Sequence, residues 1–194
     1  TSRFFVIVTN MLGGCMGTTG PKSTNPDTGK PYGSYFPRIT VEDIVQTQYL
    51  TLKQLGVKSL EAVVGGSLGG MQALEWSIAY PDWVKKCICV ATGPRLSPQA
   101  LGFEILGRKI LMNDKHFAGG DFYEGEVPAK GLAFARMIGL LTYLSADSMS
   151  SKFNRKNQGE FNPDNFETGF DVESYLQYNA EKFVDRFDAN SYLH

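Results

Sequence analysis

The chain has 194 residues, which is long enough for one domain with a sizeable buried core. Hydrophobic residues make up 42% of it and charged residues 20%, as is typical of a globular protein. The formal net charge of -1 gives no basic excess for binding nucleic acid or an anionic membrane surface.

Cysteine usage and the distribution of apolar residues predict the compartment. No apolar run reaches the ~18 residues of a membrane-spanning helix, and the N-terminal apolar stretch is too short for a signal peptide. The three cysteines have a spacing that predicts neither a disulfide framework nor a zinc site. Cys87 and Cys89 share one face of a predicted strand and are expected to be small buried hydrophobes. A reducing, cytoplasmic location and no bound metal are therefore expected.

The first elements in chain order are a strand and a helix separated by an irregular segment. Residues 4–9 are continuous apolar β-formers, which predicts a strand covered on both faces. The segment 10–38 is dense in Gly, Pro, Asn, Ser and Thr and is expected to be irregular. A helix is predicted to begin after the capping residue Thr40 and to stop at Gly56.

A strand, a helix and a strand follow, at 60–64, 71–80 and 87–91. Alternation of this kind predicts an α/β fold with a parallel sheet. After about residue 94 the strand pattern stops, and helical patterns cover 97–113, 129–145 and 171–187. We therefore predict a sheet domain at 1–94 and a mostly helical cap region at 95–194.

Ser67 lies in a G-x-S-x-G motif that joins the predicted strand 60–64 to the following helix. Such a turn forces the serine into a strained conformation and exposes its Oγ at the carboxyl end of the sheet. Gly65 and Gly69 are expected to remove side chains that would block the approach of helix to strand. The backbone N–H of Leu68 would then face a developing oxyanion, so Ser67 is predicted to be a catalytic nucleophile.

The glycine-rich segments allow two other interpretations. Ser67 in such a turn could merely cap the helix that follows. A second glycine cluster at 13–20, followed by Pro21 and Lys22, matches neither the P-loop nor the dinucleotide-binding pattern. We predict for this cluster a compact loop packed beside the active site.

Longer motifs around Ser67 resemble the homoserine O-acetyltransferase family, whose members have the α/β-hydrolase fold. The elbow segment GGSLGGMQALEW (65–76) resembles the signature of that family. Four further segments resemble its loop after the preceding strand and its lid helices: NMLGGCMGTTGP (10–21), NPDTGKPYGSYFP (25–37), GLAFARMIGLLTYLS (131–145) and FDVESYLQYNAEKFVDRFDANSYL (170–193). The resemblance covers nearly the whole chain, in order.

This resemblance implies an α/β-hydrolase core, here with a partial parallel sheet, and a helical lid. It implies a ping-pong acetyl transfer through an ester on Ser67, from acetyl-CoA as the donor substrate to L-homoserine in methionine biosynthesis. No bound cofactor is implied. A lid over the acyl-enzyme would keep water from competing with homoserine. Members of the family form homodimers through their lid helices.

The resemblance also assigns Arg136 and Tyr143 as substrate-binding residues of the lid. A guanidinium can hold the homoserine carboxylate in a bidentate pair. The spacing of the two residues would place them on one face of a helix. An exposed charge and a core aromatic are the structural alternatives. Leu140 stands where the family usually has His, so the polar network there is expected to differ.

A serine nucleophile needs a general base and a group that orients it. After Ser67 the chain offers only His116, expected at the surface, and His194, the last residue. Neither matches the family's base, and the family's triad Asp and His lie beyond the matched segments. The chain is therefore expected to be an internal piece of a longer enzyme, without significant turnover of its own.

The sequence leaves three alternatives open. The first is the same chemistry with succinyl-CoA as donor or serine as acceptor; Arg38, Arg95 and Arg108 are candidate cations for a succinyl carboxylate. The second is a serine hydrolase or esterase on the same fold. The third is a non-catalytic, structural or interaction module in which Ser67 is idle.

Overall fold

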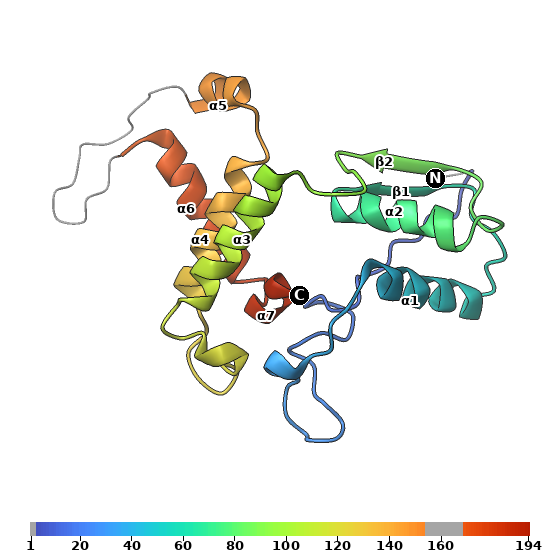
Figure 1. Ribbon diagram of the computed structural model, residues 1–194, viewed down its shortest axis with the longest axis horizontal. Helices are drawn as coiled ribbons and strands as arrows, with labels where there is room; N and C mark the ends of the chain where they lie inside the picture. The colour runs from blue at the N-terminus through green and yellow to red at the C-terminus, as the bar shows by residue number, and fades with distance from the viewer. Residues whose placement is uncertain (1–2, 154–168) are drawn as a thin grey trace. The chain divides into compact units, whose positions relative to one another are not determined.

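The computed structural model describes residues 3–153 and 169–194 (Figure 1). The chain forms two compact units, Thr1–Ser97 with His194 and Pro98–Leu193. The sequence-based division at 94/95 stays a prediction.

The first unit is built around a parallel pair of strands. Strand β1 (Val63–Gly66) pairs with β2 (Cys87–Val90), with Val63 opposite Cys87 and Gly66 opposite Val90. Helix α2 (Leu68–Ala79) connects the two strands and lies against one face of the pair (Figure 1). The predicted strand–helix–strand unit with parallel strands is therefore confirmed.

The side chains of Cys87 and Cys89 lie on the face of the strand pair that α2 covers. The thiols of Cys87 and Cys89 lie 3.4 Å apart and reach the carbonyl oxygens of Ala73 and Gly70 in α2. The two cysteines thus share a face, as predicted, but both residues are exposed, so the prediction that they are buried is wrong. The reason is that β2 pairs along one edge only among the described residues, which leaves its backbone open to solvent.

Helix α1 (Val41–Gln54) begins as the sequence predicts. Thr40 and Asp43 form a capping box in which each side chain accepts a hydrogen bond from the other residue's backbone N–H, at 2.9 and 3.2 Å. Val45 and Leu52 pack with Trp76 of α2 in the core of this unit. Burial of these side chains stabilises the pairing of α1 with α2.

The strand expected at 4–9 is absent from the described structure, where these residues are irregular. Phe5 is 85% exposed and Val8 is 90% exposed, so the expected cover on both faces is also wrong. A strand exists only where a neighbouring strand satisfies its backbone groups. Apolar β-forming side chains alone do not supply that neighbour.

The glycine-rich segment that follows is compact and contains the short 3-10 helix η1 (Gly33–Tyr35). The N–H of Gly13 donates to the carbonyl of Thr19 at 2.9 Å, and the N–H of Gly20 donates to Ser23 Oγ at 3.0 Å. Gly13 has a φ of 83°, a conformation that favours glycine. The compact loop is as predicted; its place beside an active site stays a prediction.

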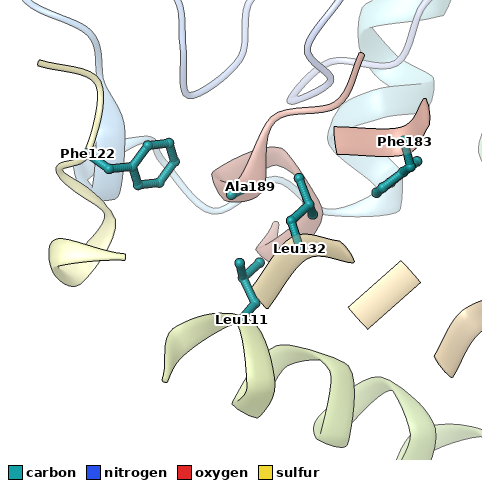
Figure 2. Packing of buried hydrophobic residues seen from close by; sticks show 5 residues of the cluster. All are labelled: Leu111, Phe122, Leu132, Phe183 and Ala189. Carbon is teal, nitrogen blue, oxygen red and sulfur yellow. The ribbon is translucent and has the colours of Figure 1, made fainter. Parts of the chain in front are cut away.

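The second unit is helical, and Figure 1 shows its elements. They are α3 (Pro98–Met112), the 3-10 helix η2 (Ala118–Gly120), α4 (Ala129–Leu141), α5 (Ala146–Phe153), α6 (Asp171–Val184) and α7 (Ala189–Leu193). Helix α4 packs against both α3 and α6. Leu111, Phe122, Leu132, Phe183 and Ala189 form the buried core between them (Figure 2).

The helix predicted at 129–145 is shorter in the structure, where α4 ends at Leu141 and the next helix, α5, begins only at Ala146. Helix α4 ends in a turn where the Thr142 hydroxyl donates to the carbonyl of Gly139 at 2.8 Å. Ser145 then caps α5, because its Oγ accepts the backbone N–H of Ser148 at 3.1 Å. Within residues 3–153 and 169–194, no helix has the length and apolar character to cross a membrane.

Candidate active site

Ser67 occupies the single residue between the end of β1 and the start of α2. Its φ of 53° and ψ of -122° are unusual for a residue with a side chain. Such a conformation costs about 1–3 kcal/mol and persists only when the surroundings fix it. The sequence predicted a strained serine at this turn, and the backbone has that strain.

The end of β2 and the first turn of α2 hold this conformation. The N–H of Ser67 donates to the carbonyl of Val90 at 3.0 Å. The carbonyl of Ser67 accepts hydrogen bonds from the N–H groups of Gly70 and Met71, at 2.9 and 3.2 Å. It also accepts one from Thr92 Oγ1 at 2.8 Å. Thr92 was not among the predicted site residues, because no local sequence pattern indicates a contact across 25 positions.

Glycines make the close approach of strand and helix possible, but not all of those predicted. A Cβ at Gly65 would overlap the carbonyl of Gly69, so Gly65 must lack a side chain. A Cβ at Gly69 would meet nothing within 4 Å, so its predicted role is wrong. The second close approach belongs to Gly70, whose Cβ would lie 2.7 Å from Thr92 Cβ.

Leu68 is the first residue of α2, so its backbone N–H is one of the donors that a helix leaves without a partner in its first turn. The helix dipole favours negative charge at this end. An N–H in this position can therefore stabilise an oxyanion that forms on an acyl group attached to Ser67 Oγ.

The alternative in which Ser67 caps α2 does not describe this site. The Ser67 side chain makes no capping hydrogen bond, and the residue is exposed. A capping serine has an extended backbone and accepts an N–H from the second or third helical residue. Ser67 has neither property, so its hydroxyl faces solvent at a helix N-terminus.

In the second unit the structure brings Arg136 and Tyr143 together. Nη1 of Arg136 donates to the Tyr143 hydroxyl at 3.0 Å. The guanidinium carbon lies 5.2 Å from the centre of the Tyr143 ring and 4.8 Å from that of Phe183. Helix α4 ends at Leu141, so the prediction that both residues lie on one helix face is wrong, although the pair forms. Tyr143 reaches Arg136 from the turn that follows.

Arg136 retains hydrogen-bonding capacity. Its Nε is buried and has no partner among the described residues. A buried donor without an acceptor is costly, and a bound anion can offset that cost. Leu140, where the resemblance led us to expect a difference from the family, is only 4% exposed and belongs to the apolar interior.

The two histidines have partners other than Ser67. Nε2 of His116 lies 3.1 Å from a carboxylate oxygen of Glu126, and the His116 N–H donates to Asp114 Oδ1 at 2.9 Å. The His116 side chain is 27% exposed and its partner Glu126 is 80% exposed, so the pair lies at the surface, as expected for this histidine. His194 lies edge-on to Phe36, with 5.5 Å between the ring centres. These contacts assign neither histidine as a base for Ser67.

A chain of hydrogen bonds through the amides of Gln48 and Gln72 (the amide chain) lies beside α2 and was not predicted. The Trp76 indole N–H donates to Gln48 Oε1 at 2.8 Å, and Gln48 Nε2 donates to Gln72 Oε1 at 2.8 Å. Gln72 Nε2 in turn donates to the sulfur of Met11 at 2.8 Å. The chain links α1, the nucleophile helix α2 and the start of the glycine-rich segment.

Residues 1–193 match the family profile described as the alpha/beta hydrolase fold. The chain belongs to this family. Its elbow, with a strained serine between a parallel strand and a helix, is the geometry this fold uses to present a nucleophile. The predicted fold class is thereby confirmed.

Relatives in the family bear out the resemblance to homoserine acyltransferases. The chain is 52% identical over 177 residues to a homoserine O-acetyltransferase of Methanococcus vannielii, covering 89% of this chain and 35% of that protein. It is 50% identical over 174 residues to a homoserine O-succinyltransferase of Halorhodospira halophila, covering 89% of this chain and 46% of that protein. The chain thus spans between about a third and half the length of these relatives.

Solved structures show the same fold. The homoserine O-acetyltransferase from Bacillus anthracis has a TM-score of 0.81 and 29% identity, over 91% of this chain and 47% of that one. A crystallised esterase has a TM-score of 0.79 and 32% identity, over 91% of this chain and 49% of that one. Transferases and esterases therefore share the architecture of this chain.

Proposed function

We propose that this chain carries the nucleophile and part of the substrate site of a homoserine O-acyltransferase that uses acetyl-CoA. The observation that carries the proposal is Ser67, held with a φ of 53° at the start of α2. Two relatives at 50% and 52% identity bear the names of homoserine acyltransferases, which supports the substrate class.

The proposed reaction has two half-reactions. Ser67 Oγ attacks the thioester carbonyl of acetyl-CoA while its proton passes to a general base. The C–S bond then breaks, and coenzyme A leaves as the thiol after receiving a proton. The side-chain hydroxyl of homoserine attacks the resulting ester, its proton passes to the base, and Ser67 is released with its own proton restored. The N–H of Leu68 stabilises the oxyanion in both steps.

Arg136 and Tyr143 are proposed to bind homoserine. The guanidinium of Arg136 would take the homoserine carboxylate, and its buried Nε without a described partner supports an acceptor of that kind. Tyr143 orients the guanidinium through the 3.0 Å hydrogen bond to Nη1. Both residues lie in the second unit, and their proposed roles do not depend on the chemistry at Ser67.

The choice between acetyl-CoA and succinyl-CoA as the acyl donor needs a separate argument. Relatives at nearly equal identity are named for acetyl and for succinyl transfer. A succinyl donor needs a cation for its distal carboxylate. Of the three candidates, Arg108 already donates to the carbonyl of Leu193, while Arg38 and Arg95 are exposed. Among the described residues no contact directs one of these arginines toward a succinyl group, so acetyl-CoA, which needs no such cation, is the donor we propose.

A hydrolase is the second candidate, because a crystallised esterase at 32% identity shares the fold. The difference is the fate of the acyl-enzyme, which water cleaves in an esterase and homoserine cleaves in a transferase. Release of acetate from acetyl-CoA in the absence of homoserine would favour the esterase.

The proposal is tested on the whole protein that carries this chain. Acetyl-CoA and succinyl-CoA are each supplied with homoserine or serine, and the acylated amino acid is quantified. Mass spectrometry of the rapidly quenched enzyme is expected to find the acyl group on the peptide that contains Ser67. Ser67→Ala is expected to abolish both signals; full transfer by this variant would indicate an idle serine and a non-catalytic role.

Assembly and location follow from the same proposal. Exposed apolar side chains on α3 and α4, among them Leu101, Leu106 and Phe134, support a homodimer formed through the lid helices. Light scattering on the whole protein tests this directly. The odd cysteine count supports the reducing cytoplasm as its location.

A further inference from the structure

Thr92 lies at the carboxyl end of β2, next to the nucleophile. Ala91, between the strand and Thr92, has a φ of 48°, which is rare for a residue with a side chain. This left-handed residue turns the chain after Val90. The turn accompanies the 2.8 Å hydrogen bond from Thr92 Oγ1 to the carbonyl oxygen of Ser67.

That carbonyl belongs to the same peptide group as the Leu68 N–H. A trans peptide is planar, so its C=O and N–H point in opposite directions and rotate together. A donor that fixes the Ser67 oxygen therefore fixes the direction of the Leu68 N–H as well. Hydrogen bonds accepted by the oxygen also polarise the amide and strengthen its N–H as a donor.

The end of β2 thus holds Ser67 on both sides. The carbonyl of Val90 accepts the Ser67 N–H at 3.0 Å, and the Thr92 hydroxyl donates to the Ser67 C=O. The N–H groups of Gly70 and Met71 bind the same oxygen from within the helix. Thr92 differs from these two donors because it follows β2 and does not belong to the first turn of α2. Its hydroxyl therefore fixes the Ser67 carbonyl from outside the helix.

The packing of Thr92 agrees with this arrangement. A Cβ at Gly70 would lie 2.7 Å from Thr92 Cβ, so Thr92 sits directly against the first turn of α2. Its methyl group fills the space above Gly70, while its hydroxyl makes the hydrogen bond. The two groups can therefore be tested separately.

We propose that Thr92 is a positioning residue for acyl transfer: its hydroxyl fixes the Ser67–Leu68 peptide so that the Leu68 N–H faces the oxyanion. This inference rests on the proposed function, in which Ser67 forms the acyl-enzyme. Thr92 does not touch the reacting atoms in this scheme and acts through the peptide group.

Thr92→Ser and Thr92→Ala form the decisive pair, because both lack the methyl group and only serine keeps the hydroxyl. In the whole protein, Thr92→Ala is expected to lower kcat about 10–100-fold, less than the loss of an oxyanion donor itself. The KM for acetyl-CoA is expected to change little. Thr92→Ser is expected to stay within about threefold of the parent in kcat, because it restores the hydrogen bond.

A fluorophosphonate probe gives an independent readout, because its tetrahedral adduct places an oxygen in the oxyanion position. The rate of inactivation is expected to fall in Thr92→Ala in parallel with kcat and to recover in Thr92→Ser. Equal rates in the two variants would overturn the inference, whether both are fast or both are slow. Thermal unfolding of each variant confirms that folded proteins are compared.

Ser67→Ala separates this inference from the proposed function. If Ser67→Ala still transfers the acyl group, the proposed function fails. If Ser67→Ala is inactive while Thr92→Ala equals Thr92→Ser, only the role of Thr92 fails. If Thr92→Ala does not fold, Thr92→Val supplies the variant without a hydroxyl, and kcat equal to that of Thr92→Ser again overturns the inference.

Discussion

The hydroxyl of Tyr143 accepts a hydrogen bond from Nη1 of Arg136 at 3.0 Å, although the helix that carries Arg136 ends two residues before Tyr143. The ring of Phe183 lies on the same guanidinium, 4.8 Å from its central carbon. A guanidinium held by one hydrogen bond and two aromatic rings has few orientations. Arg136 is therefore preorganised, and its buried Nε keeps a donor for an anion.

The first prediction concerns this arginine. Arg136→Lys keeps the charge but loses the planar fork, and it is expected to raise the KM for homoserine at least about 10-fold, since hydrogen bonds to charged groups contribute about 1.5–3 kcal/mol. Acylation of Ser67 by acetyl-CoA is expected to remain unchanged. Steady-state kinetics with varied homoserine and rapid-quench measurement of the acyl-enzyme separate the two effects.

Lys152→Gln is the matched control, because Lys152 is another cation in the same unit and lies 4.5 Å from the centre of the Tyr175 ring. It is expected to leave the KM for homoserine unchanged. An Arg136→Lys variant with a parental KM would show that the arginine does not bind the substrate.

The second prediction compares two glycines of the elbow. Gly65→Ala is expected to destabilise the protein by about 1–3 kcal/mol or more, because the new Cβ would overlap the carbonyl of Gly69. Gly69→Ala is expected to be neutral or stabilising by up to about 1 kcal/mol, since it meets open space in a helical position. Urea denaturation of both variants measures the difference, and equal stabilities would contradict the assignment.

Local chemistry explains which parts of the structure were predictable. The sequence predicted α1 because its capping box joins Thr40 to Asp43, three residues apart. It predicted the elbow because the close approach at Gly65 also involves a residue only four positions away, Gly69. The strand expected at 4–9 depends on a neighbouring strand, which a local pattern does not contain.

Non-local contacts account for what was missed at the site. The hydrogen bond of Thr92 to Ser67 depends on the pairing of β1 with β2 and on the left-handed Ala91. Tyr143 was placed on a helix because of its spacing from Arg136, whereas Ser145 begins a new helix and shortens the first. Capping by Ser145 competes with continuation of the helix, and periodicity alone does not decide that competition.

The third prediction concerns pH and Asp114. Burial raises the pKa of this carboxyl, but hydrogen bonds from the N–H groups of His116 and Gly131 outweigh burial and lower the pKa below its ordinary value. A lowered folded-state pKa means that the carboxylate stabilises the protein above the unfolded-state pKa. This stabilisation is lost as the pH falls through the folded-state pKa.

Asp114→Asn is therefore expected to lower stability at pH 7 by about 0.5–1.5 kcal/mol, because Asn has one acceptor oxygen for the two N–H groups, of His116 and Gly131, that the two carboxylate oxygens accept. The difference from the parent is expected to shrink on acidification below about pH 4, where the unfolded carboxyl is protonated. Asp147→Asn, at an exposed acid in the first turn of α5, is the control. A difference that stays constant from pH 7 to pH 3 would exclude the carboxylate as its source.

The last prediction tests the amide chain beside the nucleophile helix. Gln48→Leu removes the acceptor of the Trp76 indole N–H and the donor to Gln72 Oε1. Trp76 and Gln72 are 3% and 6% exposed, so water does not readily replace these bonds. Each orphaned group costs about 1–3 kcal/mol, and the free energy of unfolding is expected to fall accordingly.

Gln46→Leu makes the same substitution at an exposed position of α1 and is expected to change stability by less than about 0.5 kcal/mol. Urea denaturation followed by tryptophan fluorescence compares the two variants. Because Gln72 also donates to Met11, the Gln48→Leu variant is further expected to increase proteolysis of the segment 10–38. If Gln48→Leu and Gln46→Leu are equally stable, the amide chain does not hold α1 against α2.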